Sequence, residues 1–372
     1  MNLFFSERWS VWVAVWTSFV LTAQSLSAQP APGEKNFSRE AMLRALVQNV
    51  ITPGYAKVAD HCRSLAKDIE QFNAALSQTE LDRARRSWIA ASEAADSLRC
   101  LQTGPVADRE FVATFYYWQV IPSRIEGTIK DAAQTIDQAL LDNAGATAKG
   151  LNAMEYLLFD RRGGQPTEPP DAAKALDLLS ASPRRREYLA AVARDVADKA
   201  AQLSADWSAT GPQSAAEKFT ADGQAGVNLL VNQLTQSLEN TFQKHLEFVL
   251  MLPAPIDRQI YRIKGSRSGS SLPSVIAMLE GVDKFYRGEN GLGLRDAVNR
   301  LNPALATRVQ DKLTTAITAS REIGAPLERA VVDKRTAVQN AVDQTHELEI
   351  LFKVDLASAL GVTITFTSGD GD

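Results

Sequence analysis

A short segment near the middle of the chain carries an amide and a carboxylate at helical spacing. Residues 149–159 read KGLNAMEYLLF, with Asn152 and Glu155 three positions apart. On a helix, side chains at this spacing share one face, and Gly150 would let a neighbouring backbone approach closely. A carboxylate is a hard oxygen ligand that suits hard metal ions. Taken alone, however, one Asn and one Glu on a helix are more typical of a solvated face.

The other residue types that support catalysis are scarce. The chain has three histidines and two cysteines, too few for the ligand clusters of structural zinc sites. His346 precedes Glu347 without the second histidine of a zincin motif, and neither a G-x-S-x-G elbow nor a Walker A loop occurs. The segments around His346 and His245 are therefore predicted to be solvated helix faces.

The N-terminal segment is typical of an export signal. Val11–Leu26 is apolar, and small residues follow up to Ala28. This pattern predicts a signal peptide over residues 1–28, cleavage near Ala28 and a periplasmic protein that contacts membrane only through this segment before cleavage. The alternative is an uncleaved anchor helix, which the polar residues inside the run disfavour.

Export makes a disulfide between Cys62 and Cys100 the favoured prediction. The two cysteines lie in consecutive helical patterns, which neighbouring antiparallel helices would bring together. Two buried free thiols are the alternative.

The elements that position these residues are predicted to be helices. Capping signals occur at Ser38, at Thr79–Asp82 and at Ser182-Pro183. Pro53-Gly54 predicts a break or kink, and a long pattern over residues 326–360 is predicted to end at Gly361.

Long helices joined by short polar breaks predict an all-α fold of two antiparallel helical bundles packed side by side, each a four-helix-bundle variant. The predicted boundaries are 38–190 for the N-terminal bundle and 191–372 for the C-terminal bundle. Because 40 basic residues are balanced by 44 acidic ones, the chain has no polycationic patch of the kind that binds nucleic acid. The basic run at Arg184–Arg186 lies at a predicted helix start, where the helix dipole disfavours cations, so acidic partners across the bundle are expected.

Several motifs together resemble the imelysin-like proteins of bacterial envelopes. Their signature is G-x-H-x-x-E followed by an aromatic residue and two leucines, and residues 150–158 match it except that Asn152 replaces the histidine. Further matches follow in the family's order from about residue 38 to the C-terminus: Arg85 with Trp88, Gly104-Pro105, Trp118 with Arg124, Arg184–Leu189, Ser268–Leu272, Leu360–Val362, Phe366 and Gly369–Asp372.

The resemblance implies an all-helical protein with two domains, a role in bacterial iron uptake and a polar site between the domains, built around the signature. The expected site residues are Gly150, Asn152 and Glu155, with Glu155 as the metal ligand. The hydroxyl-rich turn before the helix at Pro273 suits an anion or carboxylate. Arg124 and the turn's Ser268 and Ser271 are therefore expected nearby.

Three functional hypotheses follow. The first is a non-enzymatic protein of iron acquisition that binds iron, an iron chelate or another envelope iron-uptake protein between the bundles. The second is the metallopeptidase activity with which the family is labelled. Loss of the motif histidine at Asn152 disfavours it, because neutral Asn binds transition metals far more weakly than imidazole does. The third is an envelope scaffold without a metal.

Overall fold

A computed structural model describes residues 37–107, 111–159, 172–252 and 260–365. These residues form helices and connecting segments, and no strand occurs among them, so the all-α prediction is confirmed. None of the described helices is long and apolar enough to cross a membrane. The predicted signal peptide over residues 1–28 and the family-like close at Phe366–Asp372 lie outside the described residues.

The helices from α1 to α10 form a first group. Helix α2 packs against α3 and α9, and α7 packs against both α3 and α9. The members of the group are α1 (Arg39–Leu46), α2 (Thr52–Ala75), α3 (Gln78–Asp96), α5 (Pro122–Lys130), α6 (Gln138–Asn143), α7 (Gly150–Phe159), α8 (Ala172–Ala181), α9 (Pro183–Ser208) and α10 (Ala215–Thr220).

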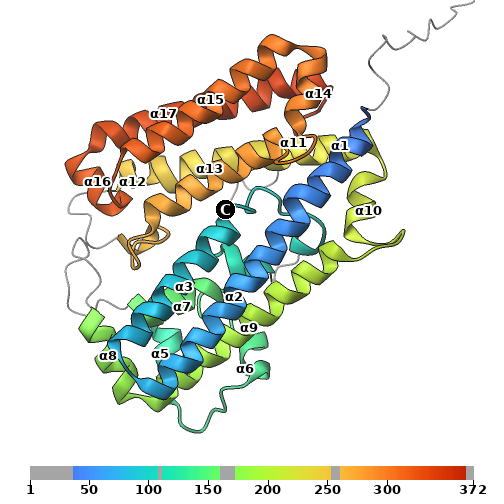
Figure 1. The fold of residues 1–372 in the computed structure, drawn as a ribbon. Helices are drawn as coiled ribbons and strands as arrows, with labels where there is room; N and C mark the ends of the chain where they lie inside the picture. Colours follow the sequence, from blue (N-terminus) through green and yellow to red (C-terminus); the bar gives the residue numbers. More distant parts are fainter. Residues whose placement is uncertain (1–36, 108–110, 160–171, 253–259, 366–372) are drawn as a thin grey trace, which may run out of the picture. The chain divides into compact units, whose positions relative to one another are not determined.

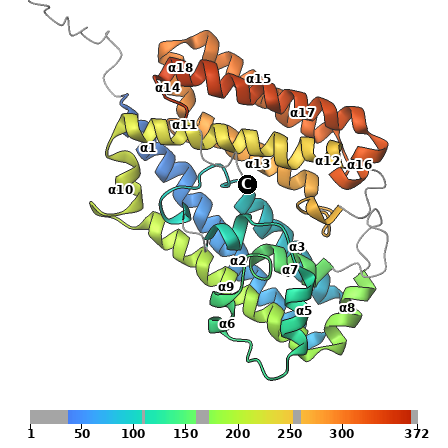
Figure 2. The same ribbon diagram turned by 180° about the vertical axis from the view of Figure 1, so that it is seen from behind.

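The helices from α11 onward form a second group, which runs across the direction of α2 and α9 in both views (Figures 1 and 2). Helix α13 packs against α3 of the first group, and α11 packs against α1. The members are α11 (Gly223–Asn240), α12 (Phe248–Met251), α13 (Ser271–Arg287), α14 (Leu294–Leu301), α15 (Pro303–Glu322), α16 (Leu327–Asp333), α17 (Arg335–Ile350) and α18 (Ala357–Leu360).

This grouping is consistent with the two predicted bundles, although residues 38–372 cluster as one compact unit. Helix α9 continues uninterrupted across residues 190 and 191 and ends only at Ser208. The chain therefore does not leave the first group at the predicted boundary, and the division into two domains stays a prediction.

Local capping chemistry explains several helix ends. The Ser38 hydroxyl accepts a hydrogen bond from the Ala41 amide, and Ser182 caps α9 with Pro183 in its first turn. Gly361 ends α18 in the left-handed conformation, at φ 66°. These three predicted ends are confirmed. The capping box predicted at Thr79–Asp82 is wrong, because Ser77 caps α3 by accepting from the Glu80 amide.

Within the described residues, four segments are π-helical, a form that the sequence pattern did not predict. They are η1 (Val47–Ile51), η3 (Val112–Tyr116), η4 (Thr241–Glu247) and η7 (Leu351–Leu356). Segment η1 joins α1 to α2, so the helix continues through Pro53 instead of ending there. The long helix predicted over residues 326–360 is divided at Lys334 and contains η7.

The predicted disulfide is not formed, because Cys62 and Cys100 are both free and buried. Leu76 and Ser77 join the antiparallel helices α2 and α3, so Cys62 lies opposite roughly residue 91. Cys100 lies about nine residues further along, beyond the end of α3 at Asp96, and the five helical residues up to Asp96 alone span about 7.5 Å. A disulfide requires Cα atoms within about 7 Å. The prediction that both cysteines lie in helices holds for Cys62 on α2, but Cys100 lies in the turn that follows α3.

We expect two alkylatable thiols per chain after denaturation without reductant, and none in the native protein. Burial raises the pKa of Cys62 and of Cys100 to about 12, so the reactive thiolate is scarce at neutral pH. Mass spectrometry after iodoacetamide treatment measures the count. Protein that yields no alkylated cysteine after denaturation would contradict the two free thiols.

Candidate functional site

Helix α7 carries the signature residues and begins against the backbone of η3. Gly150 has φ 77°, and a Cβ added there would lie 2.6 Å from the Thr114 carbonyl oxygen and 2.8 Å from that of Ala113. Only glycine fits both the left-handed backbone and the close approach. All ten residues of α7 are buried, so its polar side chains must find partners inside the protein.

Asn152 uses both of its N–H donors within the first group of helices. Its Nδ2 donates to the carbonyl oxygens of Gln119 at 2.8 Å and Ala146 at 2.9 Å. These bonds tie α7 to the segments before α5 and after α6. The Oδ1 atom is buried and has no hydrogen-bond partner in the described chain. Asn152 therefore links α7 to two neighbouring segments through its amide donors, and its Oδ1 remains as an acceptor with a fixed orientation.

Glu155 reaches across to the second group. Its side chain is buried, with 4% of the residue exposed, and its Oε1 accepts from the Ser268 amide at 3.0 Å and the Ser268 hydroxyl at 2.8 Å. These two hydrogen bonds offset part of the cost of burying a carboxylate. The structure thus brings together Glu155 and Ser268, as the sequence predicted, from segments 113 positions apart.

Ser268 lies in a tight turn over residues 265–270, which a backbone hydrogen bond closes into a small ring of chain, called here the Ser268 ring. The Ser270 amide donates to the Gly265 carbonyl oxygen at 2.9 Å, and the hydroxyls of Ser268 and Ser270 are 2.7 Å apart. Gly265 has φ 74°, and a Cβ there would lie 2.7 Å from the Ser271 amide nitrogen. The ring is therefore too narrow for a side chain at this position, and its backbone holds Ser268 in place.

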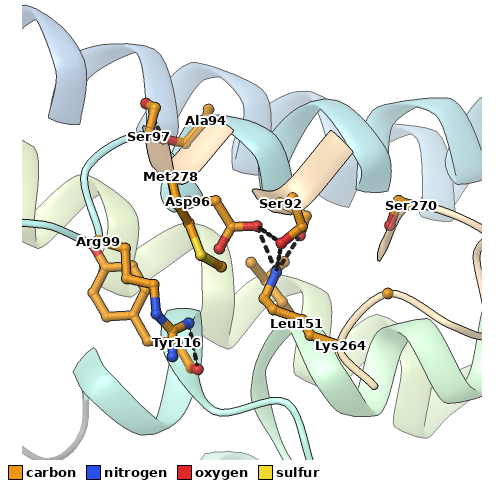
Figure 3. A network of polar contacts seen from close by, with 12 residues as sticks. Ser92, Ala94, Asp96, Ser97, Arg99, Tyr116, Leu151, Lys264, Ser270 and Met278 are labelled. Carbon is orange, nitrogen blue, oxygen red and sulfur yellow. Dashed lines mark hydrogen bonds and ion pairs between the residues drawn. The ribbon is translucent and has the colours of Figure 1, made fainter. Parts of the chain in front are cut away.

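A buried ion pair anchors this ring to α3 (Figure 3). Lys264 Nζ lies 2.5 Å from Asp96 Oδ2 and 2.9 Å from the Ser274 hydroxyl, and Ser274 also donates to Asp96 at 2.6 Å. Asp96 is 1% exposed. No motif in the sequence connects these two residues. The signal of the pair was a charged residue on the buried face of α3, eight positions after Trp88.

Beside this pair lies an aromatic and cationic cluster. The Arg99 guanidinium donates to the Tyr116 carbonyl oxygen at 2.9 Å and stacks over the rings of Tyr116 and Trp118 (Figure 3 shows Arg99 and Tyr116). The ring of His245, in η4, packs 5.0 Å from Trp118. Burial, with help from Arg99 and Lys264, holds the pKa of His245 well below its usual range. The predicted solvated position of His245 is therefore wrong, whereas His346 is exposed as expected.

A second network surrounds Tyr156, the residue after Glu155. The Tyr156 hydroxyl donates to Glu126 Oε1 at 2.8 Å, and Arg185 forms an ion pair with the same oxygen at 2.5 Å. Arg185 and Arg267 both lie over the Tyr156 ring. The acidic partner expected for the basic run at Arg184–Arg186 is thus Glu126, on α5.

Two predicted site residues have other surroundings. Arg124 is exposed on α5 and lines a separate cavity of about 450 Å³ beside Gly145 and Tyr188. The Ser271 hydroxyl bonds to Glu328 of α16 at 2.5 Å and accepts from the Leu327 amide. The structure therefore joins Ser271 to the interior of the second group and leaves it out of the contacts made by Glu155.

The described residues do not fit a resident metal ion. They contain no group of three His, Cys, Asp or Glu side chains that could hold one, and a protein metal site ordinarily needs about that many ligands. At the signature, Glu155 offers a single carboxylate whose Oε1 is engaged by Ser268. Asn152 directs its amide donors to carbonyl oxygens. The site suits hydrogen bonding better than direct coordination.

Comparison with known proteins places these observations in a family. A family model described as imelysin, Peptidase_M75, matches residues 51–352. Iron-regulated protein A of Synechococcus elongatus is 24% identical over 325 residues, covering 83% of this chain and 85% of that protein.

Two crystal structures have the same fold. An iron-regulated protein A precursor from Parabacteroides distasonis superposes with a TM-score of 0.73 at 17% identity, over 89% of this chain and 98% of that one. An imelysin-like protein from Psychrobacter arcticum superposes with a TM-score of 0.64 at 19% identity, over 89% and 99% of the two chains.

Proposed function

Because this chain belongs to the imelysin family, we propose that it is an exported periplasmic protein of iron acquisition whose site around Glu155 binds an iron chelate or a partner protein of iron uptake. The name of its relative, iron-regulated protein A, supports the connection to iron. The export pattern of residues 1–28 supports the compartment.

The observation that carries the site assignment is the buried contact between Glu155 and Ser268. It joins α7 of the first group to the ring before α13 of the second. Buried carboxylates that serve only packing are rare, because apolar residues of similar size pack without the cost of desolvation. Asn152 Oδ1, one helical turn away, is a buried acceptor without a partner in the described chain, so the two side chains together would suit a ligand that carries N–H or O–H donors.

We favour a chelate or a protein over a bare iron ion as the ligand. The described residues supply one carboxylate at the signature and no group of three metal-ligating side chains. A chelate brings its own ligands for the metal and needs only recognition by hydrogen bonds and charge. The same scarcity of ligands gives no support to the metallopeptidase alternative, which requires a held metal and an activated water.

Glu155→Gln is expected to abolish the iron-dependent function while leaving the fold intact. The amide oxygen of Gln still accepts from Ser268, so helical content and melting temperature should stay near those of the wild type. The substitution removes the negative charge of Glu155, which we propose interacts with the ligand. Growth under iron limitation, in a strain whose only copy carries the change, should fall to the level of the deletion strain.

The matched control is Glu70→Gln, on an exposed position of α2, which should grow like the wild type. Binding of ferric citrate to purified protein, measured by calorimetry, provides a direct second readout. Wild-type growth and unchanged ferric citrate binding in the Glu155 variant would show that the site assignment is wrong and would favour the scaffold hypothesis.

A further inference from the structure

A second cavity lies on the α2 side of α3, where α2, α3 and α13 meet. Its volume is about 360 Å³, within the range of small-molecule sites. It is lined by Lys57 and His61 of α2, by Ala90, Glu93, Ala94 and Ser97 of α3, and by Pro273, Ile276, Ala277, Glu280 and Lys284 of α13. No residue of the Glu155 site contributes to it.

Small residues create this space. A Cβ at Gly281 would lie 2.1 Å from the Ser97 carbonyl oxygen, so α13 crosses the end of α3 in backbone contact. Beside the crossing the two helices present Ala90, Ala94 and Ala277 to each other. Their short side chains leave the gap between the helices unfilled, and they give the cavity an apolar floor.

Two lysines on this cavity form no ion pair with the residues that the structure describes, although the sequence offers each of them a carboxylate at helical spacing. Glu280 precedes Lys284 by four positions, the favoured spacing for a helical ion pair, yet it pairs with Arg321 of α15 at 2.5 Å. Asp60 follows Lys57 by three positions, yet it pairs with Arg63 at 2.7 Å.

Lys57 is exposed and Lys284 is partly buried, whereas several other partly buried lysines in the described chain have carboxylate partners. Lys264 pairs with Asp96, Lys199 with Asp195, and Lys353 with Glu349. Lys57 and Lys284, in contrast, form no ion pair within the described residues. Two cations from different groups of helices therefore face one cavity without a partner for their charge.

Among the remaining titratable groups of the cavity, Glu280 is paired with Arg321, and the pKa values of Glu93 and His61 are shifted in the direction that favours their neutral forms. Burial, Asp96 and Glu280 raise the pKa of Glu93, although Lys264 and Lys57 oppose the shift. Burial and the neighbouring Lys57 lower the pKa of His61, which Asp60 partly opposes. With Glu280 paired to Arg321, the two lysines outnumber Glu93, the one other carboxylate of the lining, so the cavity carries a net positive charge.

We propose that this cavity is a binding site for a small organic carboxylate, whose anionic group lies between Lys57 and Lys284 and whose hydrocarbon part lies on the floor of Ala90, Ala94 and Ala277. A carboxylate between two ammonium groups forms charge-assisted hydrogen bonds. The apolar floor favours a ligand with an aliphatic chain over an inorganic anion.

The bound anion also changes the protonation of its neighbours. Its negative charge favours the protonated forms of Glu93 and His61, so it raises the pKa of both. Binding is then accompanied by proton uptake, and by linkage the affinity increases as the pH falls.

Butyrate is a suitable probe, because it combines one carboxylate with a short aliphatic chain. Calorimetric titration of the full mature protein should show saturable binding, weaker binding of inorganic phosphate and no binding of butylamine. Lys284→Met and Lys57→Met should each weaken butyrate binding roughly tenfold or more, as expected for the loss of a charge-assisted hydrogen bond.

The matched control is Lys67→Met, at an exposed position of α2 away from the cavity, which should bind butyrate like the wild type. Glu155→Gln should also leave butyrate binding unchanged, which separates this site from the one proposed for iron. The proposal is overturned if the wild type does not bind butyrate, if the three lysine variants bind it equally, or if the affinity increases with pH.

Discussion

Replacing Lys264 with methionine is expected to lower the free energy of unfolding by about 3–5 kcal/mol, because it leaves the Asp96 carboxylate buried without its cation. Asp96 is 1% exposed and its Oδ1 already lacks a partner in the described chain. After the substitution the Ser274 hydroxyl would be the one donor to this carboxylate among the described residues. Urea denaturation followed by circular dichroism measures the change.

Two further variants make the result specific. Combining Lys264→Met with Asp96→Asn removes the buried negative charge that has lost its cation, and it should restore part of the lost free energy of unfolding. Lys312→Met breaks the ion pair with the exposed Glu347 and should cost less than about 1 kcal/mol. Equal effects of the Lys264 and Lys312 substitutions would contradict the importance of the buried pair.

Gly281→Ala is expected to destabilise the protein by about 3 kcal/mol, at the upper end of the cost of overpacking. The added Cβ would lie 2.1 Å from the Ser97 carbonyl oxygen and 2.8 Å from its carbon. Both are backbone atoms that no side-chain rotation can move away. Helix α13 would therefore have to separate from α3, and the contact between the two groups of helices would loosen. A thermal melt of the variant tests this.

Gly127→Ala is the matched control, because it lies inside α5 and an added Cβ there meets no atom within 4 Å. Alanine is the better helix former, so this variant should be more stable than the wild type by about 0.5–1 kcal/mol. The two substitutions are chemically identical, and opposite signs are expected. A stable Gly281→Ala protein would show that the crossing tolerates separation.

Features that depend on neighbouring residues were predictable from the sequence. The caps at Ser38 and Ser182 and the end at Gly361 follow from hydrogen bonds and backbone angles within one turn. The shared face of Asn152 and Glu155 follows from helical spacing alone. The hydroxyl-rich turn was predicted to orient a carboxylate, and Ser268 does bond to Glu155.

Features that depend on three-dimensional register were not predictable in the same way. Lys264 and Asp96 are 168 positions apart, and no local rule connects them. The pairing of the cysteines failed for a related reason, since helix neighbours were inferred without their relative heights. The orientation of Ser271 toward Glu328 depends on how α13 and α16 pack, which a periodic pattern does not specify.

The π-helical segments affect how this chain should be aligned with its distant relatives. A π-helical turn accommodates an extra residue without ending the helix, and one residue corresponds to a rotation of about 100°. A relative with a plain α-helix in place of η1, η4 or η7 would be one residue shorter there. At 17–24% identity, a gap placed in the nearest loop would pair core positions of this chain with surface positions of the relative. Gaps of one residue therefore belong inside these helices.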